Sequence, residues 1–479
     1  MLVRRALVAV LAATLAGGLG GCRSRGASSP VDAPQATVRV GKRPDFVDPT
    51  PRGTSAWKDT RRFYAGRGNR PAWLTDAAAT STFDQLLEAV LRAGEHGLTP
   101  DDYGAVPLQA DRESLAVRWP SRIDPARLAA VDVRLTYTFF RLARDLSQGR
   151  IDPGDVSPQF LGATPRVDLV ARLEAALDGG QIGGTLADLA PTHPQYTWLQ
   201  LALPRYRTAA DAAPADAMAS WQVRQIEMNM ERWRWLPRTL GRRYVLVNVP
   251  AYVLQAVEGI RPVLAMRVVV GDPKSPTPLF SDRMTYVVFS PYWNIPESIL
   301  RAETLAQAAG DPTFFARAGI ELVRTSGPAE ERVDPTTIDW STDPVAQGIR
   351  FRQVPGPNNA LGQVKFIFPN HFDVYLHDTP NHAAFERPQR AYSHGCVRVE
   401  DPVALAEYVL RDQPDWTRAR IVSAMETHDE SVATLPDPIP VHLGYWTTWV
   451  EGDGTLAFTD DPYGLDERHD RALRRHQGY

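Results

Sequence analysis

Cys396 is the residue of this chain whose neighbours could do chemistry. It lies in the segment AYSHGCVRVE (391–400), with His394 two positions before it and Arg398 two positions after it, and Cys22 is the only other cysteine. A thiol attacks as its thiolate, so an imidazole base and a nearby guanidinium would both favour a nucleophilic role. The alternative is a buried cysteine that packs as a small apolar side chain. The spacing favours the nucleophile.

Groups on both sides of the cysteine fit the same chemistry. His377 or His394 could take the thiol proton as general base, and Arg398 would add a fixed positive charge. Gly395 has no side chain, so the main chain can approach a reacting carbonyl closely. The N–H groups of Gly395 and Cys396 could therefore form an oxyanion hole.

The segment VKFIFPNHFDVYLHDTP predicts the elements that must hold these groups. Residues 369–371 are a turn sequence between two runs of period two, so 364–368 and 372–377 are predicted to pair as a hairpin. Alternation divides the second strand into two faces, with Phe372, Val374 and Leu376 on one and Asp373, Tyr375 and His377 on the other. Asp401 and Pro402 then begin a predicted helix, which places the cysteine on a short connection.

The chain begins with a signal-peptide pattern. Arg4 and Arg5 precede an apolar, small-residue run over 6–21, which is shorter than the ~20 residues needed to span a bilayer. Residues 19–22, LGGC, resemble a bacterial lipobox, in which the cysteine is lipidated. An ordinary secretory signal with a chance cysteine is the alternative.

The lipobox resemblance implies a signal peptide over 1–21 and lipidation of Cys22, so that the mature protein is anchored to a membrane outside the cytoplasm. Residues 22–57 are rich in Pro, Ser, Arg and Thr and are predicted to be a lipidated tether. Arg23 stands where retained lipoproteins of Gram-negative bacteria carry aspartate. This favours the periplasmic side of the outer membrane.

Composition narrows the classes of partner. A formal net charge of -3 and a pI of about 6.4 give no basic surplus, which argues against nucleic acid. No stretch after residue 21 is long and apolar enough to span a membrane. With Cys22 lipidated no disulfide can form, and a thiol kept free in an oxidising compartment points to a use for it.

Hydrophobic periodicity divides the rest of the chain into a helical and a β-rich half. Residues 58–205 carry helical spacing, and the small-residue segment 206–220 is predicted to be a linker. Residues 221–425 change to period two after one helix, and further strands and a tail are predicted over 426–479. The predicted fold class is multidomain α+β, with an all-helical N-terminal domain followed by a β-rich domain.

The segments YLHDTP and SHGCVR together resemble the active-site motif of the L,D-transpeptidases, the YkuD family. Other segments of the second half, among them NMERWRWLP, PYWNIPESI and FRQVPGPNNALGQVKF, are similar to the large YcbB-like members. The helical first half, with GLTPDDY and HPQYTWLQLALPRYR, is similar to their scaffold domain. The resemblance implies that 221–425 is a YkuD-like catalytic domain behind a helical scaffold domain.

The resemblance also implies a role for each matching residue. Cys396 would be the nucleophile and His377 its base, with the main-chain carbonyl of Asp378 orienting the imidazole. His394 would shape the pocket and the oxyanion region, and Arg398 would help to place the substrate.

Less specific expectations concern the surroundings of the site. Tyr375 and Trp293 are expected to line the pocket, and residues 300–350 correspond to the capping element of the family. YcbB-like enzymes commonly carry a small peptidoglycan-binding module after LALPRYR, where this chain has a short Ala-rich segment. The lipid anchor and tether would substitute by restricting the enzyme to the membrane surface.

The implied substrate is a peptidoglycan stem tetrapeptide. Cys396 would attack the carbonyl of the third residue, release the terminal D-alanine and pass the acyl group to an amine of a neighbouring stem, which gives a 3-3 cross-link. Water as acceptor would make the protein an L,D-carboxypeptidase, and a lipoprotein lysine would give wall attachment or release. No cofactor or metal is needed. Expected partners are stem peptides, the membrane through the lipid anchor and cell-wall synthesis proteins.

Two other classes of function stay open at the level of sequence. His371, His377, His382 and His394 lie near Cys396 and could suggest a metal site, although their spacing differs from the tight or helical pairs of zinc signatures. A wall-binding lipoprotein without activity would leave the cysteine structural. Such a retired site would be expected to have lost its cysteine, base or arginine, and all are present.

Overall fold

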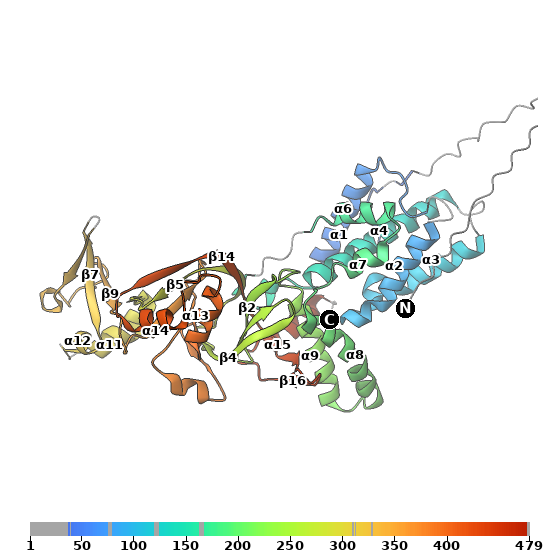
Figure 1. The fold of residues 1–479 in the computed structure, drawn as a ribbon. Coiled ribbons are helices and arrows are strands. Elements are labelled where there is room, and N and C mark those ends of the chain that lie inside the picture. The colour runs from blue at the N-terminus through green and yellow to red at the C-terminus, as the bar shows by residue number, and fades with distance from the viewer. Residues whose placement is uncertain are drawn as a thin grey trace, which may run out of the picture.

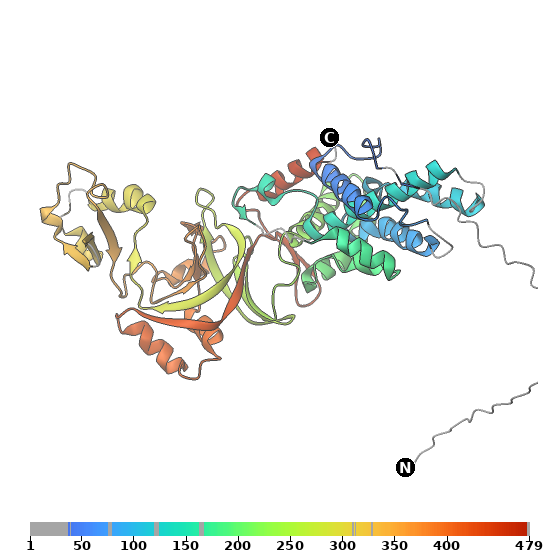
Figure 2. The ribbon, with the colours of Figure 1, turned by 90° about the horizontal axis from the view of Figure 1, so that it is seen from above.

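The computed structural model describes residues 37–476 apart from 39, 75–78, 119–123, 162–166, 309–310, 312 and 327–328. The predicted signal peptide and Cys22 lie outside the described residues. The helical N-terminal half, the main sheet and a small second sheet follow one another along an elongated molecule (Figures 1 and 2). Among the described helices, none has the length and apolar character needed to cross a bilayer.

The N-terminal half is helical, as the periodicity predicts. Its longest helix, α4, begins with Pro125 behind an Asp124 N-cap and is buried along most of its length. Helices between residues 51 and 118 and between residues 169 and 187 contribute side chains to the same hydrophobic core. The helices of this half and their bounds are α1 (Pro51–Gly66), α2 (Ala79–Leu91), α3 (Ala105–Arg118), α4 (Pro125–Gln148), α5 (Pro153–Val156), α6 (Leu169–Asp178), α7 (Ile182–Ala187), α8 (Pro194–Ala212) and α9 (Ala217–Trp233).

The predicted linker over 206–220 is mostly helical. Helix α8 continues to Ala212 and α9 begins at Ala217, so only a short turn separates them. Alanine has the highest helix propensity, and the Ala-rich segment therefore extends the helix instead of loosening the chain. The two helices pack against each other.

A closed path of strands forms the second half. The neighbours run β5-β10-β11-β13-β4-β3-β2-β14, and β14 pairs with β5 as well as with β2, which closes the path as in a barrel. The short strands β1 and β12 attach to β5 and β4. The bounds are β1 (Phe160–Leu161), β2 (Arg243–Asn248), β3 (Val253–Glu258), β4 (Arg261–Gly271), β5 (Leu279–Phe289), β10 (Val364–Ile367), β11 (Leu376–His377), β12 (Ala391–Ser393), β13 (Val397–Val399) and β14 (Ser431–Gly444).

Strand β14 belongs to this sheet, although the sequence-based boundary after residue 425 leaves it outside the catalytic domain. Its residues 431–434 and 439–442 pair with β5, and 441–444 pair with β2. Prolines at 436, 438 and 440 interrupt the pattern expected of a regular strand, because proline removes a ladder donor. The register shifts between Thr434 and Ile439, where the prolines lie.

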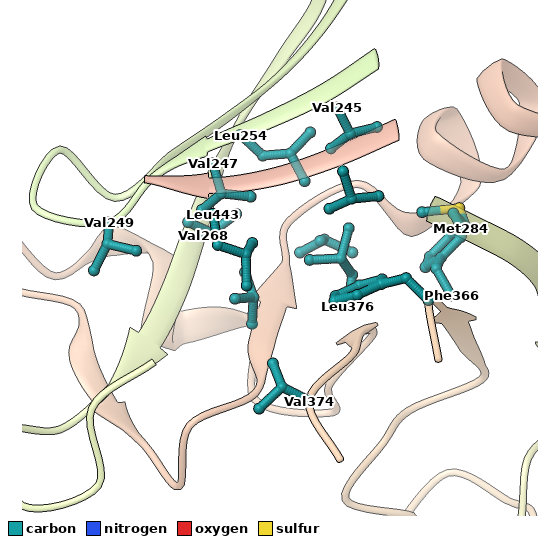
Figure 3. Packing of buried hydrophobic residues seen from close by; sticks show 14 of the residues in the cluster. Val245, Val247, Val249, Leu254, Val268, Met284, Phe366, Val374, Leu376 and Leu443 are labelled. Atoms are coloured by element: carbon teal, nitrogen blue, oxygen red, sulfur yellow. The ribbon is translucent and has the colours of Figure 1, made fainter. Parts of the chain in front are cut away.

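One face of the closed sheet is a continuous apolar core. Figure 3 shows side chains from β2, β3, β4, β10, β11 and β14 packed together, among them Val245, Leu254, Val268, Phe366 and Leu376. Helices α13 (Pro402–Leu410) and α14 (Arg418–Glu426) add Leu405 and Ile421 to the same cluster. Burial of these side chains fixes which face of each strand is turned away from the core.

A small second sheet forms the far end of the molecule. Its order is β6-β9-β7-β8, and it encloses its own hydrophobic cluster. The elements are β6 (Trp293–Asn294), α10 (Glu297–Ile299), η3 (Leu300–Thr304), α11 (Leu305–Ala308), α12 (Phe314–Arg317), β7 (Ile320–Ser326), β8 (Ala329–Val333) and β9 (Ile349–Gln353). This unit covers the segment expected to form the capping element, and we call it the capping unit.

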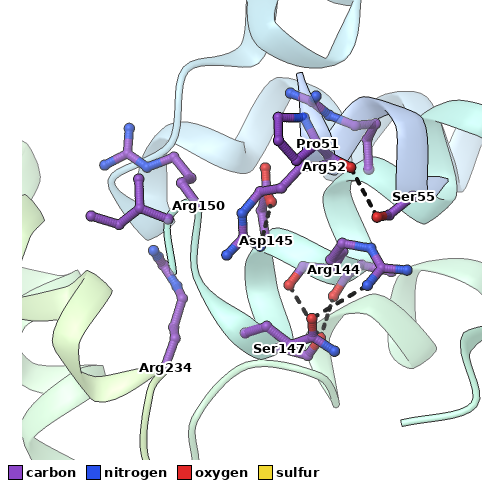
Figure 4. A network of polar contacts seen from close by, with 12 residues as sticks. Pro51, Arg52, Ser55, Arg144, Asp145, Ser147, Arg150 and Arg234 are labelled. Carbon is purple, nitrogen blue, oxygen red and sulfur yellow. Dashed lines mark hydrogen bonds and ion pairs between the residues drawn. The ribbon is translucent and has the colours of Figure 1, made fainter. Parts of the chain in front are cut away.

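Buried charges join helices of the N-terminal half to one another. Glu231 of α9 pairs with Arg234 at 2.7 Å and accepts a hydrogen bond from the main chain of Arg150. Figure 4 shows Arg150 and Arg234 beside Asp145 of α4, which pairs with Arg52 at 3.5 Å. Breaking one member of such a network would leave a buried charge unpaired, so the network restricts how these helices pack.

Acid is expected to destabilise the protein through its buried histidines. His193 stacks on Trp233 and His442 lies under Tyr244, and burial lowers the pKa of each imidazole to about 4. As the pH falls below 6.5, each of these histidines takes up a proton in the unfolded chain but stays neutral in the folded chain. The free energy of unfolding therefore falls by about 1.4 kcal/mol per histidine for each pH unit between 6.5 and 4. The melting temperature should fall from pH 7 to 5, less steeply in His193→Gln. The same slope in both proteins would contradict this.

Candidate active site

The strand ladder brings the cysteine and the histidine to one face of the sheet. Strands β11 and β13 are parallel neighbours, with Leu376 opposite Val397 and His377 opposite Arg398. The Val397 N–H donates to the main-chain oxygen of Tyr375, which sets Tyr375 beside Cys396. Paired residues of neighbouring strands point to the same face.

The side chains around the sulfur come from the segment before β11. The Cys396 Sγ lies 3.8 Å from the main-chain oxygen of Asp373. The Tyr375 ring meets the His377 ring edge to face, with 5.8 Å between centroids. In the described part of the chain no hydrogen bond joins the His377 ring to the sulfur. A rotation of the thiol away from Asp373 would be needed to turn it toward the imidazole.

His377 is held by the main chain that follows it. Its Nδ1 lies 2.5 Å from the main-chain oxygen of Asp378, and the side chain is 4 % exposed. Because Nδ1 donates to this carbonyl, Nε2 carries the lone pair of the neutral imidazole. The Asp378 carboxylate points elsewhere and accepts from the Gln363 N–H at 2.9 Å.

The strand predicted over 372–377 is regular only in β11. Strands β10 and β11 pair as predicted, with Lys365 opposite His377. Asp373, however, has a φ of 54°, and the Asn370 side chain hydrogen-bonds the main chain of Phe372 and Val374. The turn therefore takes up most of the predicted strand, because the asparagine competes with ladder pairing.

Buried side chains fix the loop that carries Cys396. Thr277 donates to the Gly395 carbonyl at 2.8 Å, and Ser393 donates to the Cys396 carbonyl at 2.5 Å. Gly395 has a φ of 113°, which suits glycine alone. Its N–H donates to the Ser393 hydroxyl at 3.2 Å, whereas the Cys396 N–H has no hydrogen-bond partner among the described residues. Of the two donors predicted for an oxyanion hole, only that of Cys396 is free in this structure.

The remaining predicted residues lie at different distances from the thiol. His394 is half-exposed, and its Nε2 lies 2.7 Å from Glu303 of the capping unit. Arg398 is on the same face as His377. Trp293 lies in β6 and packs against the hydrophobic cluster of the capping unit. Among the described residues no three His, Cys, Asp or Glu side chains form a group that could hold a metal.

Two models of known protein families match this chain. Residues 58–203 match a scaffold domain, and residues 242–428 match the L,D-transpeptidase catalytic domain, YkuD. The second half of the chain therefore contains an L,D-transpeptidase catalytic domain of the YkuD type. Its catalytic domain contains both the Cys396 loop and the β10–β11 hairpin, and the helical half is its scaffold domain.

A protein named "Putative L,D-transpeptidase" from Haemophilus influenzae is 28% identical over 407 residues, which cover 85% of this chain and 78% of that protein. An L,D-transpeptidase structure from Mycobacterium smegmatis is 13% identical over 42% of this chain and 58% of that one, with a TM-score of 0.19. The structure of L,D-transpeptidase 3 from Mycobacterium tuberculosis is 12% identical over 42% of this chain and 60% of that one, with a TM-score of 0.18. This chain thus spans less than two thirds of the length of these solved chains.

Electrostatics keep the Cys396 thiol and the His377 imidazole neutral. Burial raises the pKa of the Cys396 thiol to about 11, although polar groups of Tyr375 and the charge of Arg398 act against it. Burial, and then the charge of Arg398, lower the pKa of His377 to about 3. The charge of Arg398 acts on the Cys396 thiol in the expected direction, but desolvation outweighs it, so the neutral thiol dominates in the free protein.

Alkylation of Cys396 tests this charge state. With a thiol pKa raised to about 11, the thiol form dominates below that pH, and the rate with iodoacetamide should rise about tenfold per pH unit from pH 7 to 10. The modified Cys396 peptide is followed by mass spectrometry. A rate that is already constant from pH 6 to 8 would mean a thiolate in the free enzyme and would contradict the neutral pair.

Sequence reasoning missed residues that act through tertiary contacts. Thr277 accepts from the Gly271 N–H at 2.9 Å while it holds Gly395, and its own N–H donates to the Tyr463 hydroxyl at 3.1 Å. Tyr463 belongs to the C-terminal segment that the sequence placed outside the catalytic domain. No local pattern marks either residue, since only the closed sheet brings them to the loop.

Proposed function

We propose that the protein is a peptidoglycan L,D-transpeptidase that uses Cys396 as its nucleophile. The observation that carries this proposal is the placement of Tyr375, His377, Cys396 and Arg398 on one sheet face within a matching catalytic domain. The donor substrate is a stem tetrapeptide. The expected lipid anchor at Cys22 would hold the enzyme on the periplasmic side of the outer membrane.

In the first step the thiol of Cys396 attacks the carbonyl carbon of the third stem residue while His377 takes its proton. A neutral imidazole is the form that can accept it, which the low pKa of His377 secures at neutral pH. The oxyanion is stabilised by the free Cys396 N–H. The C–N bond then breaks, His377 returns the proton to the leaving amine, and D-alanine departs from a thioester.

In the second step an amine of a neighbouring stem attacks the thioester carbonyl. His377 takes the proton of the amine, the C–S bond breaks, and an amide forms between two third residues. The sulfur leaves as thiolate and recovers the proton from His377. Donor and acceptor are thus joined without ATP, because the energy of the first peptide bond is kept in the thioester.

Reaction with a carbapenem tests the nucleophile without any acceptor. By analogy with the family, one β-lactam should add to Cys396, so that the intact mass rises by one carbapenem and the adduct maps to the peptide around residue 396. Ring opening leaves no fragment to be lost. An adduct on another residue, or none in a folded sample, would contradict the proposed nucleophile.

A further inference from the structure

Lys365 lies beside the active-site histidine on the face of the sheet that carries Cys396. Strand pairing sets Lys365 opposite His377, and His377 opposite Arg398, so the three side chains form a row on one face. The Lys365 Nζ donates to the main-chain oxygen of Tyr292 at 3.3 Å. His377 is therefore flanked by a cation on each side.

These two cations have no acidic partner in the row. Among the described residues no carboxylate forms an ion pair with Lys365 or Arg398, and the buried Nε of Arg398 has no hydrogen-bond partner. Burial lowers the pKa of Lys365, and the charge of Glu430 acts in the opposite direction. Two half-buried cations that form no ion pair with a carboxylate favour the binding of an anion beside them.

The donor peptide brings an anion to this place. To protonate the leaving amine, His377 must lie next to it, and in a terminal D-alanine the amine and the carboxylate are attached to the same carbon. Cys396 and Arg398 lie on the β13 side of His377, whereas Lys365 lies on the β10 side. A leaving group that extends from the scissile carbonyl past His377 therefore brings its carboxylate to Lys365.

We propose that Lys365, with Arg398 as the second cation, binds the terminal carboxylate of the donor stem and makes the enzyme specific for stems that end in a free carboxylate. This inference rests on the proposed function. The ammonium would hold the leaving D-alanine beside His377, and the carboxylate would offset the positive charge on both sides of the imidazole when it takes up a proton.

Two donors that differ in one group test the inference in the full-length protein. One is a disaccharide tetrapeptide with a free terminal carboxylate, and the other is the same molecule ending in a carboxamide. The release of D-alanine or D-alaninamide is measured for wild type, Lys365→Gln, Lys365→Arg and Lys58→Gln, whose lysine is exposed on α1. For the donor with a free carboxylate, kcat/KM should be about ten- to a hundredfold lower in Lys365→Gln than in wild type, which is the usual effect of losing a hydrogen bond to a charged group.

The carboxamide separates recognition from folding. Lys365→Gln should release D-alaninamide from the carboxamide donor at a rate within about threefold of wild type. On the donor with a free carboxylate, Lys365→Arg should recover much of the activity that Lys365→Gln loses. Lys58→Gln should match wild type on both donors. Equal losses on both donors, or no loss on the acid, would overturn the inference while the transpeptidase proposal stands. Release of neither product by wild type would overturn the proposed function and this inference with it.

Discussion

Cys396→Ala is expected to abolish turnover of the stem peptide, with a loss of about four orders of magnitude or more. In the proposed reaction the thiol forms the covalent bond to the donor, so no other group can replace it. The side chain is small and half-buried, and the loop is fixed by Thr277 and Ser393 through main-chain oxygens that the variant keeps. The melting temperature should therefore stay within about 2 °C of wild type.

The measurement is the release of D-alanine from a tetrapeptide donor, with circular dichroism to show that the variant is folded. Ser393→Ala provides a matched control, since it removes a buried hydroxyl from the same loop but leaves the nucleophile. We expect this control to lose stability and to keep measurable activity. Turnover by Cys396→Ala at the wild-type rate would refute the nucleophile.

His377→Ala is expected to slow acylation by two to four orders of magnitude, about the contribution of a positioned proton-transfer group. The imidazole is the neutral base on the sheet face of Cys396, and its Nδ1 is fixed on the Asp378 carbonyl. The rate of carbapenem addition to Cys396, followed by stopped flow, reports this step without an acceptor.

Two histidine variants serve as controls for this effect. His371→Ala removes an exposed imidazole from the nearby turn and should leave the rate unchanged. His394→Ala removes the contact with Glu303 and should reduce the rate less than His377→Ala does. If His394→Ala caused the larger loss, His394 would be the base and the assignment of His377 would be wrong.

The pairing of strands β10 and β11 at the centre of the site was predictable from sequence because the two strands are joined by a short turn. The turn at 369–371 and the alternation after it predicted the β10–β11 pair and set Leu376 in the core. The motif around Cys396 and the helical first half pointed to the same two domains that the comparisons match. Short-range patterns of this kind specify elements and faces without tertiary context.

Three features could not be predicted, each for a different reason. Strand β14 has prolines at ladder positions, so its pairing with β2 and β5 appears only in the closed sheet. The segment after residue 206 has the small residues typical of a linker, but its alanines have a high helix propensity and α8 continues through them to Ala212. The charge state of the Cys396 thiol depends on burial, and the neighbours that suggested a thiolate do not outweigh desolvation.

The most direct test of the central claim is mass spectrometry of the products formed from a purified disaccharide tetrapeptide, with wild type and Cys396→Ala compared. A dimer that has lost one D-alanine, formed by wild type alone, is the predicted result. Monomer shortened by one D-alanine would show that water is the acceptor and would contradict transpeptidation. Unchanged tetrapeptide with folded wild-type protein would contradict the proposed activity on this donor.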